Sequence, residues 1–178
     1  VPDAPADGQA WADETIEVGR GFESAHAVRF YLQPGGVESV RPLQPGAPLP
    51  GYALPSFGLQ LEFEPTDFIQ VNGELNERMV GRAVELLALE PGHAVLDLFC
   101  GLGNFSLPLA TRAHEVVGIE GDAGLVARAA RNATRNALAN ATFHAADLFA
   151  DTSGAPWARR RYDRVLLDPP RAGAREVL

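Results

Sequence analysis

The sequence lacks lysine and has a single cysteine, Cys100, among its 178 residues. One cysteine excludes a disulfide framework and any metal site built from several cysteines of this chain, and a reducing, cytoplasmic compartment is expected. No apolar run approaches the roughly 20 residues that cross a bilayer. The polar start, rich in proline and alanine, has no basic region followed by an apolar one and is therefore not typical of a signal peptide. No membrane contact is expected.

Positive charge is also scarce. The 15 basic residues, all arginine, face 23 acidic ones and leave a net charge of −8, which argues against a nucleic-acid surface spread over the whole chain. Arginines gather at two places, which could form a phosphate-binding patch or a solvated helix face and a polar loop. The second interpretation is favoured. The two groups are Arg128, Arg131 and Arg135, at helical spacing, and Arg159, Arg160, Arg161 and Arg164.

Both ends of the sequence suggest a piece of a longer protein, because the first residue is Val1 rather than methionine and Leu178 falls where a helix is just starting. Residues 1–13, rich in Ala, Pro and Asp, are predicted to be loose. Residues 14–66 are predicted to form a small antiparallel β subdomain, since short apolar runs alternate with Pro- and Gly-rich links such as 44–52. The predicted strands are 15–18, 27–33, 38–42 and 59–64.

Residues 67–178 have a different pattern. Asn72 can cap a helix that runs to about Leu89, and from His93 onward short apolar strands alternate with helices, which predicts a parallel sheet built from right-handed βαβ units. The strands are predicted at 93–99, 115–120, 141–145 and 162–168, and the helices at 104–113 and 122–137. Residues predicted to face the core are Leu75, Met79, Ala83, Leu86 and Leu87 on the first helix, and Leu125, Val126, Ala129, Ala130 and Ala133 on the last, which Asp122 caps.

A glycine-rich turn follows the first of these strands, in the run from Asp97 to Asn104 (DLFCGLGN). Gly101 and Gly103 would let the backbone approach a ligand at the carboxyl edge of the sheet. A dinucleotide would require a third glycine, where Ser106 stands, and a pyrophosphate at the helix N-terminus. S-adenosylmethionine has no phosphate and does not need that glycine, so both ligands remain open on the turn alone.

Acidic residues at successive strand ends favour S-adenosylmethionine. Asp97, just before the turn, suits a cofactor that carries a sulfonium and an ammonium group. Glu120 would accept hydrogen bonds from the ribose hydroxyls of either ligand, and Asp147 could take the adenine amino group. Each of these acids alone could instead be a capping residue or a solvated loop residue. Three acids at successive strand ends make that purely structural interpretation less favoured. The fourth strand ends in Asp168-Pro169-Pro170-Arg171, a rigid corner that presents a carboxylate to a substrate or simply ends the strand.

Three ordered motifs carry a resemblance to a known family: residues 67–72 (DFIQVN), 97–105 (DLFCGLGNF) and 167–173 (LDPPRAG). They resemble the bacterial RNA (uracil-5-)-methyltransferases, nearest to the enzymes that methylate 23S ribosomal RNA. The resemblance extends back to 31–36 and 54–58. It implies an α/β fold, a truncated Rossmann-like class I methyltransferase domain preceded by the small antiparallel β subdomain. With only part of the family's sheet present, the fourth strand would be an exposed edge and invite self-association.

The resemblance also implies a site for S-adenosyl-L-methionine. Gln70 would reach the cofactor from ahead of the sheet, Glu120 would bind the ribose and Asp168 would lie beside the methyl group and the target base. Arg171 would help to hold RNA, the expected partner. The implied cofactor-binding residues are Gln70, Asp97, Phe99, Gly101, Gly103, Asn104, Glu120, Asp147 and Asp168.

The family's chemistry requires a cysteine thiolate that adds to uracil C6, so that C5 can attack the methyl group, and a base that removes the C5 proton. The resemblance implies that both groups lie beyond Leu178, and that Cys100 packs the cofactor turn instead. The family's N-terminal RNA-binding barrel and iron–sulfur cysteines are likewise absent from these residues. The parent protein is therefore expected to methylate a base flipped out of RNA, and this chain is expected to bind cofactor without turnover. The alternatives are an NAD-dependent oxidoreductase, against which the missing third glycine counts, and a non-catalytic module that binds a nucleoside-like ligand.

Overall fold

The computed structural model describes residues 13–170 and 173–174. The chain forms two compact units, one of residues 1–50 with 64–68, the other of residues 51–63 with 69–178. The loose segment predicted over residues 1–13 lies, apart from Asp13, outside the described residues. The domain boundary predicted after residue 66 stays a prediction.

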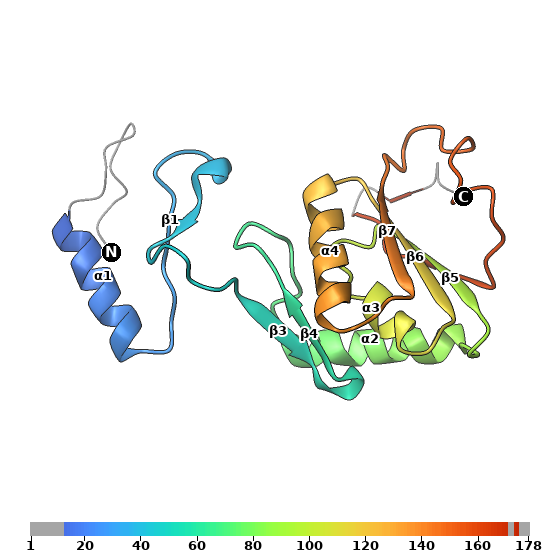
Figure 1. Ribbon diagram of the computed structural model, residues 1–178, viewed down its shortest axis with the longest axis horizontal. Helices are drawn as coiled ribbons and strands as arrows, with labels where there is room; N and C mark the ends of the chain where they lie inside the picture. The colour runs from blue at the N-terminus through green and yellow to red at the C-terminus, as the bar shows by residue number, and fades with distance from the viewer. Residues whose placement is uncertain (1–12, 171–172, 175–178) are drawn as a thin grey trace. The chain divides into compact units, whose positions relative to one another are not determined.

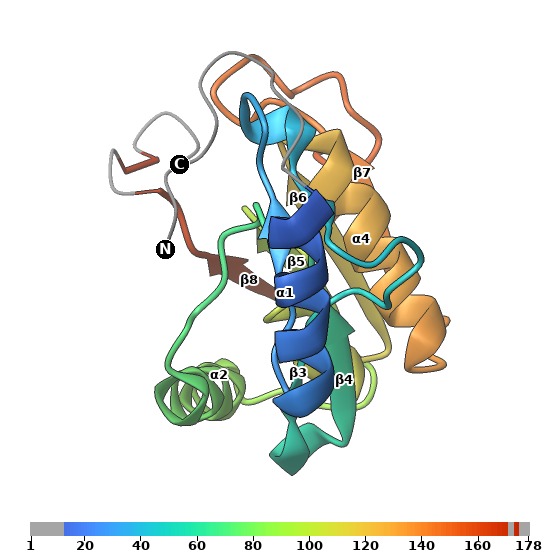
Figure 2. The same cartoon turned by 90° about the vertical axis from the view of Figure 1, so that its left-hand side faces the viewer.

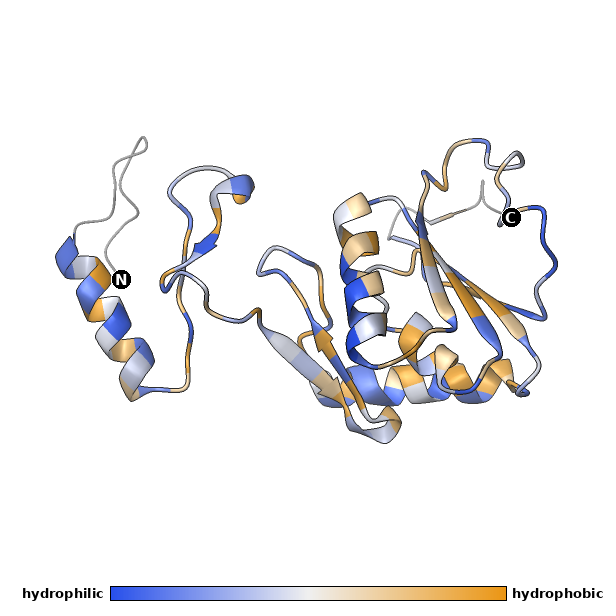
Figure 3. Ribbon diagram, in the orientation of Figure 1, coloured by the Kyte–Doolittle hydropathy of each residue, from blue (hydrophilic) through white to orange (hydrophobic). Residues whose placement is uncertain are grey.

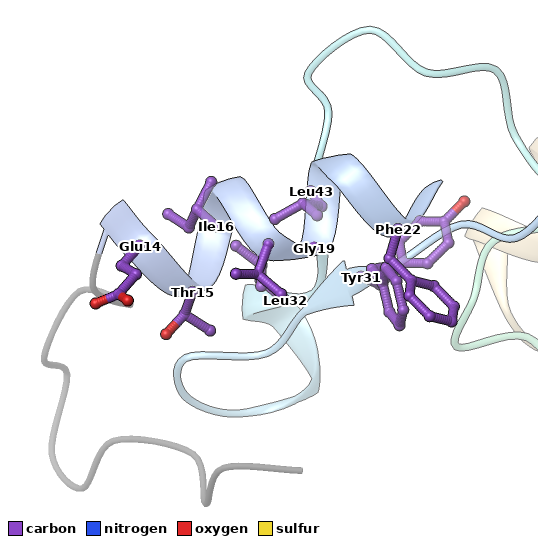
Figure 4. Close-up of a pocket in the computed structure, with 10 residues that line it drawn as sticks. Glu14, Thr15, Ile16, Gly19, Phe22, Tyr31, Leu32 and Leu43 are labelled. Carbon is purple, nitrogen blue, oxygen red and sulfur yellow. The ribbon is translucent and has the colours of Figure 1, made fainter. Parts of the chain in front are cut away.

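The first unit contains a helix and a minimal hairpin. Helix α1 (Asp13–Ala25) precedes strand β1 (Tyr31–Leu32), a 3-10 turn (η1, Val37–Ser39) and strand β2 (Arg41–Pro42), which pairs antiparallel with β1. A mainly apolar cavity of about 530 Å³ lies between α1 and the hairpin (Figure 4).

The strand predicted over 15–18 is therefore wrong, because these residues lie in α1. Ile16, Gly19 and Phe22 line the cavity at helical spacing, and a Cβ at Gly19 would come within 2.7 Å of Leu43 Cδ2. Acidic residues in the first turn also favour a helix start, because they oppose the positive end of the helix dipole.

A second hairpin belongs to the other unit. Strand β3 (Gly51–Leu54) and strand β4 (Leu59–Glu62) pair antiparallel around a short 3-10 turn (η2, Pro55–Phe57). Gly58 ends that turn at φ +67°, a conformation that glycine adopts without strain. The sequence predicted β4 but placed residues 44–52 in a link, so β3 was missed.

The main sheet has four parallel strands in the order β7-β6-β5-β8, as the alternation of strands and helices predicts. The α/β fold is confirmed, with small antiparallel sheets ahead of the parallel one. The bounds of the second and third strands agree with the prediction, and the other two are shorter. The strands are β5 (Ala94–Leu98), β6 (Glu115–Glu120), β7 (Ala141–Ala145) and β8 (Arg164–Leu167).

Helices cover one face of this sheet, and the long loop between β7 and β8 covers the other (Figure 1). The helices are α2 (Gly73–Leu87), α3 (Ser106–Ala110) and α4 (Ala123–Arg135). Strands β5 and β6 consist mainly of hydrophobic residues (Figure 3), most of which are buried. Asn72 and Asp122 cap α2 and α4 as predicted, each accepting from a backbone N–H three residues on.

The predicted inner face of α2 is partly wrong. Leu75 and Leu86 are 61% and 67% exposed, whereas Asn76 and Val80 are buried; Figure 2 views this helix nearly along its axis. Because the prediction followed apolar residues only, it missed the buried asparagine and placed the buried face of the helix one residue away from its actual position. Ala83, Val84 and Leu87 complete the side that packs on the core.

Candidate functional site

The glycine turn joins β5 to α3 at the carboxyl edge of the sheet. Phe99, Gly101 and Gly103 all have positive φ, at 64°, 55° and 97°. A Cβ at Gly103 would stand 3.1 Å from Leu107 Cγ, whereas a Cβ at Gly101 would meet nothing within 4 Å. Gly103 thus allows close packing of the turn on α3, and Gly101 leaves its backbone open to an approaching ligand.

Glu120 binds the turn directly. One of its carboxylate oxygens accepts from the Gly101 backbone N–H at 3.1 Å, and the other accepts from the Asp122 N–H at the same distance. The carboxylate therefore links the turn to the start of α4, and each oxygen keeps a lone pair for a further donor. This arrangement fits a group that receives hydrogen bonds from a ribose diol.

The structure brings the other predicted acids to the same edge. Asp147 follows β7, and its Oδ1 accepts from the Phe149 N–H at 2.9 Å. Asp168 follows β8; its side chain is exposed and its backbone N–H donates to Leu98 O at 3.4 Å. Because the strands are parallel, both carboxylates lie at the edge of the sheet from which the turn also starts.

Asp97 differs from the other acids because its side chain is fully buried. Ser106 Oγ donates to its Oδ2 at 2.5 Å, while Oδ1 has no hydrogen-bond partner among the described residues. Burial raises the Asp97 pKa to about 7; the Ser106 hydrogen bond opposes the rise, and the nearby Asp168 and Glu120 charges add to it. Asp97 therefore holds the start of α3 and has no exposed surface of its own.

Cys100 is buried under the same turn. A Cβ at Gly118 would lie 2.9 Å from its Sγ, so β6 packs closely on the thiol. Burial, followed by the charges of Asp97 and Glu120, raises the pKa of this thiol well above its ordinary value. A thiol held protonated in this way is not prepared to act as a nucleophile.

Asn104 lies in a polar cluster that the sequence did not reveal. Its Oδ1 accepts from the Tyr52 hydroxyl at 2.8 Å and from Asn76 Nδ2 at 2.9 Å, and its Nδ2 donates to Asn76 Oδ1 at 2.9 Å. The cluster joins the turn to β3 and α2. A polar residue at a core position of α2 was the one available signal, since buried amides require partners.

The aromatic residues beside the turn form a pair. The rings of Phe99 and Phe149 have centroids 5.7 Å apart and are tilted by 52°. Phe149 is 51% exposed and was not predicted as a site residue. Gln70 is also exposed, two residues before the cap of α2, and no hydrogen bond links it to the turn in the described part of the chain.

Three of the basic residues have protein partners. Arg135 pairs with Glu62 at 2.5 Å, and Arg160 makes two hydrogen bonds to Glu115. Arg164 Nε donates to the Leu87 carbonyl at 2.6 Å. Arg171 lies outside the described residues.

Over residues 13–170 and 173–174, no group of three His, Cys, Asp or Glu side chains could hold a metal ion, and no helix there is long and apolar enough to cross a membrane.

The parallel sheet, the turn after its first strand and the acids at its carboxyl edge define the Rossmann-like fold of S-adenosylmethionine-dependent methyltransferases. The family described as tRNA (Uracil-5-)-methyltransferase matches residues 58–177. The chain belongs to this family, and the resemblance found in the sequence is confirmed.

Curated relatives match nearly the whole chain. The 23S rRNA (uracil(1939)-C(5))-methyltransferase RlmD of Xanthomonas euvesicatoria pv. vesicatoria is 54% identical over 177 residues, 99% of this chain. RlmD of Stenotrophomonas maltophilia strain K279a is 54% identical over 180 residues, again 99% of this chain. The chain spans 38% of the length of each of these relatives.

Solved structures agree on the fold. The Pyrococcus abyssi tRNA (uracil-54, C5)-methyltransferase in complex with S-adenosyl-L-homocysteine matches with a TM-score of 0.66 and 24% identity, over 84% of this chain and 36% of that one. P. horikoshii TYW2 in complex with MeSAdo matches with a TM-score of 0.53 and 18% identity, over 74% of this chain and 47% of that one. At these identities the likeness supports the fold alone.

Proposed function

We propose that these residues hold S-adenosylmethionine in an enzyme that methylates a uracil C5 of 23S ribosomal RNA. One observation carries the cofactor assignment: Glu120 fixes the open backbone of the glycine turn while keeping acceptor capacity for a ribose. The relatives that match 99% of the chain carry the choice of RNA and of reaction. When bound, the cofactor would supply an electrophilic methyl group on a sulfonium.

Each site residue has a proposed part. Glu120 accepts from the ribose hydroxyls, Asp147 takes the adenine amino group, and Asp168 stands beside the methyl group and the target base. Gln70 and Phe99 contribute further cofactor contacts. Asp97 supports the turn through Ser106, whose hydroxyl donates to its carboxylate.

We further propose that the 178 residues bind cofactor but do not complete methyl transfer. The reaction requires a thiolate that adds to uracil C6, and Cys100, the one cysteine of the sequence, has a buried thiol with a raised pKa. An iron–sulfur cluster in the whole protein would likewise require other cysteines. Self-association through the edge of β8 stays a prediction, which sedimentation at rising concentration would test.

The first test is calorimetric titration of the chain with S-adenosylhomocysteine, with NAD as the competing ligand. We expect binding of the first alone. Glu120→Ala should weaken it by about tenfold or more, since hydrogen bonds to a charged group contribute about 1.5–3 kcal/mol each. Glu85→Ala, which removes an exposed carboxylate paired with Arg82 on α2, should leave the affinity unchanged. Binding of NAD alone, or of neither ligand by a folded chain, would overturn the cofactor assignment.

A further inference from the structure

The amide pair of Asn76 and Asn104 is a reciprocal arrangement, in which each side chain donates to the other's oxygen at 2.9 Å. Asn76 is 2% exposed and lies on the core side of α2. An amide buried in this way would be costly if unpaired. The pair therefore fixes the last residue of the DLFCGLGN run to a helix from outside the sheet.

Tyr52 decides which way the Asn104 amide is turned. Its hydroxyl donates to Asn104 Oδ1 at 2.8 Å, and together with the Asn76 donor it fills both lone pairs of that oxygen. Burial raises the Tyr52 pKa above its ordinary value, so the hydroxyl stays protonated. The Asn104 amide has two lone pairs and two N–H groups, and three of these four positions are occupied by Tyr52 and Asn76. One N–H is left to donate to another group, and the residue is only half-buried.

The remaining N–H matches one part of the cofactor. Glu120 and Asp147 are acceptors, which suit the ribose hydroxyls and the adenine amino group. The carboxylate of the methionine part is an acceptor itself and therefore requires a donor from the protein. A charge-assisted hydrogen bond from an oriented amide would recognise it.

We propose that Tyr52 and Asn76 are positioning residues that hold the Asn104 amide as a donor to the carboxylate of the cofactor's methionine part. This rests on the proposed function. It gives the hairpin β3–β4 and helix α2, which precede the sheet, a part in cofactor recognition. Neither positioning residue touches the cofactor in this scheme, and Asn104 transmits their effect.

The test compares two ligands that differ in the methionine part. Calorimetry would measure S-adenosylhomocysteine, which has the carboxylate, and 5′-methylthioadenosine, which lacks it, against the chain and Tyr52→Phe. We expect the variant to bind the first about three- to tenfold more weakly, the effect of losing one oriented hydrogen bond, and the second within about twofold of the unaltered chain. A purely structural role would weaken both alike.

The matched control is Tyr162→Phe, which removes a hydroxyl that donates to the Trp157 carbonyl at 3.1 Å and should leave both affinities unchanged. Asn104→Asp, which replaces the free donor by an acceptor, should affect S-adenosylhomocysteine far more than methylthioadenosine. Equal effects of Tyr52→Phe on both ligands, or no effect on either, would overturn the positioning role alone. Failure of the unaltered chain to bind S-adenosylhomocysteine would overturn the proposed function and this inference with it.

Discussion

At the scale of single residues, the site combines side chains that keep hydrogen-bonding capacity at the sheet edge with others that are buried beneath the glycine turn and support it. Glu120 and Asp147 keep acceptor capacity at the sheet edge, whereas Asp97 and Cys100 are buried beneath the turn. Burial makes these two groups hold their protons more firmly, which raises the pKa of both. The turn is thus supported by groups that are mostly neutral or only partly ionised near neutral pH.

Asp97 should make stability depend on pH. Its pKa rises on folding from 3.8 to about 7, so between these values the folded chain holds a proton that the unfolded chain has released. Stability is then lost as pH rises through this window, by up to about 4 kcal/mol when complete. We expect Asp97→Asn, which does not titrate, to gain melting temperature relative to the unaltered chain between pH 4 and pH 8.

Asp122→Asn is the control for this measurement, because it changes an exposed cap and asparagine caps helices equally well. Its melting temperature should follow that of the unaltered chain at every pH. A constant difference between Asp97→Asn and the unaltered chain across the range would contradict the pH dependence assigned to Asp97.

At the scale of elements, the spacing of apolar residues predicted the strands and helices whose position depends on local sequence. The bounds of β6 and β7, the caps of α2 and α4 and the parallel sheet follow from the sequence. Two kinds of feature could not be predicted in this way. A short run such as 15–18 alternates like a strand but lies in a helix whose Gly19 approaches Leu43, a contact that only the tertiary fold provides.

Buried amides were the other gap. Asn132 of α4 bonds the backbone N–H and carbonyl of Glu62 and the carbonyl of Leu102, and so ties the hairpin to the glycine turn. Asn76 does similar work from α2. Both asparagines occupy buried positions at which a rule based on apolar residues expects an apolar side chain. They are buried there because they provide hydrogen-bond partners for other polar groups. The acids of the site were predictable, and the polar side chains that hold the turn were not.

Two glycines provide a test at this scale, with effects of opposite sign. Gly103 has φ +97°, and a Cβ there would contact Leu107 tightly, so Gly103→Ala should lower the free energy of unfolding by more than about 1 kcal/mol and weaken the binding of S-adenosylhomocysteine. Gly81 lies inside α2 with open space around it, so Gly81→Ala should stabilise by about 0.5–1 kcal/mol. Urea denaturation would measure both, and equal effects would contradict the packing described for the turn.

At the scale of the whole molecule, charge sets a limit on how these residues meet RNA. The chain carries a net charge of −8, and Arg135, Arg160 and Arg164 are occupied by protein partners. Affinity for a phosphate backbone grows with the number of phosphates neutralised. We therefore assign most of the RNA affinity of the proposed enzyme to the part of its relatives' length that these residues do not match.

The consequence is measurable as a salt dependence. Fluorescence anisotropy with a labelled single-stranded RNA should give weak binding by the 178-residue chain, at a dissociation constant of about 10⁻⁴ M or higher. The slope of log affinity against log salt should correspond to no more than about two phosphates, since about 0.7 of a counterion is released for each one contacted. Removing acids that pair with the arginines, as in Glu62→Gln and Glu115→Gln, should steepen this slope by freeing Arg135 and Arg160. A steep slope for the unaltered chain would mean that the arginines already form a phosphate-binding surface despite their ion pairs, and would reverse the preference for a solvated helix face and polar loop.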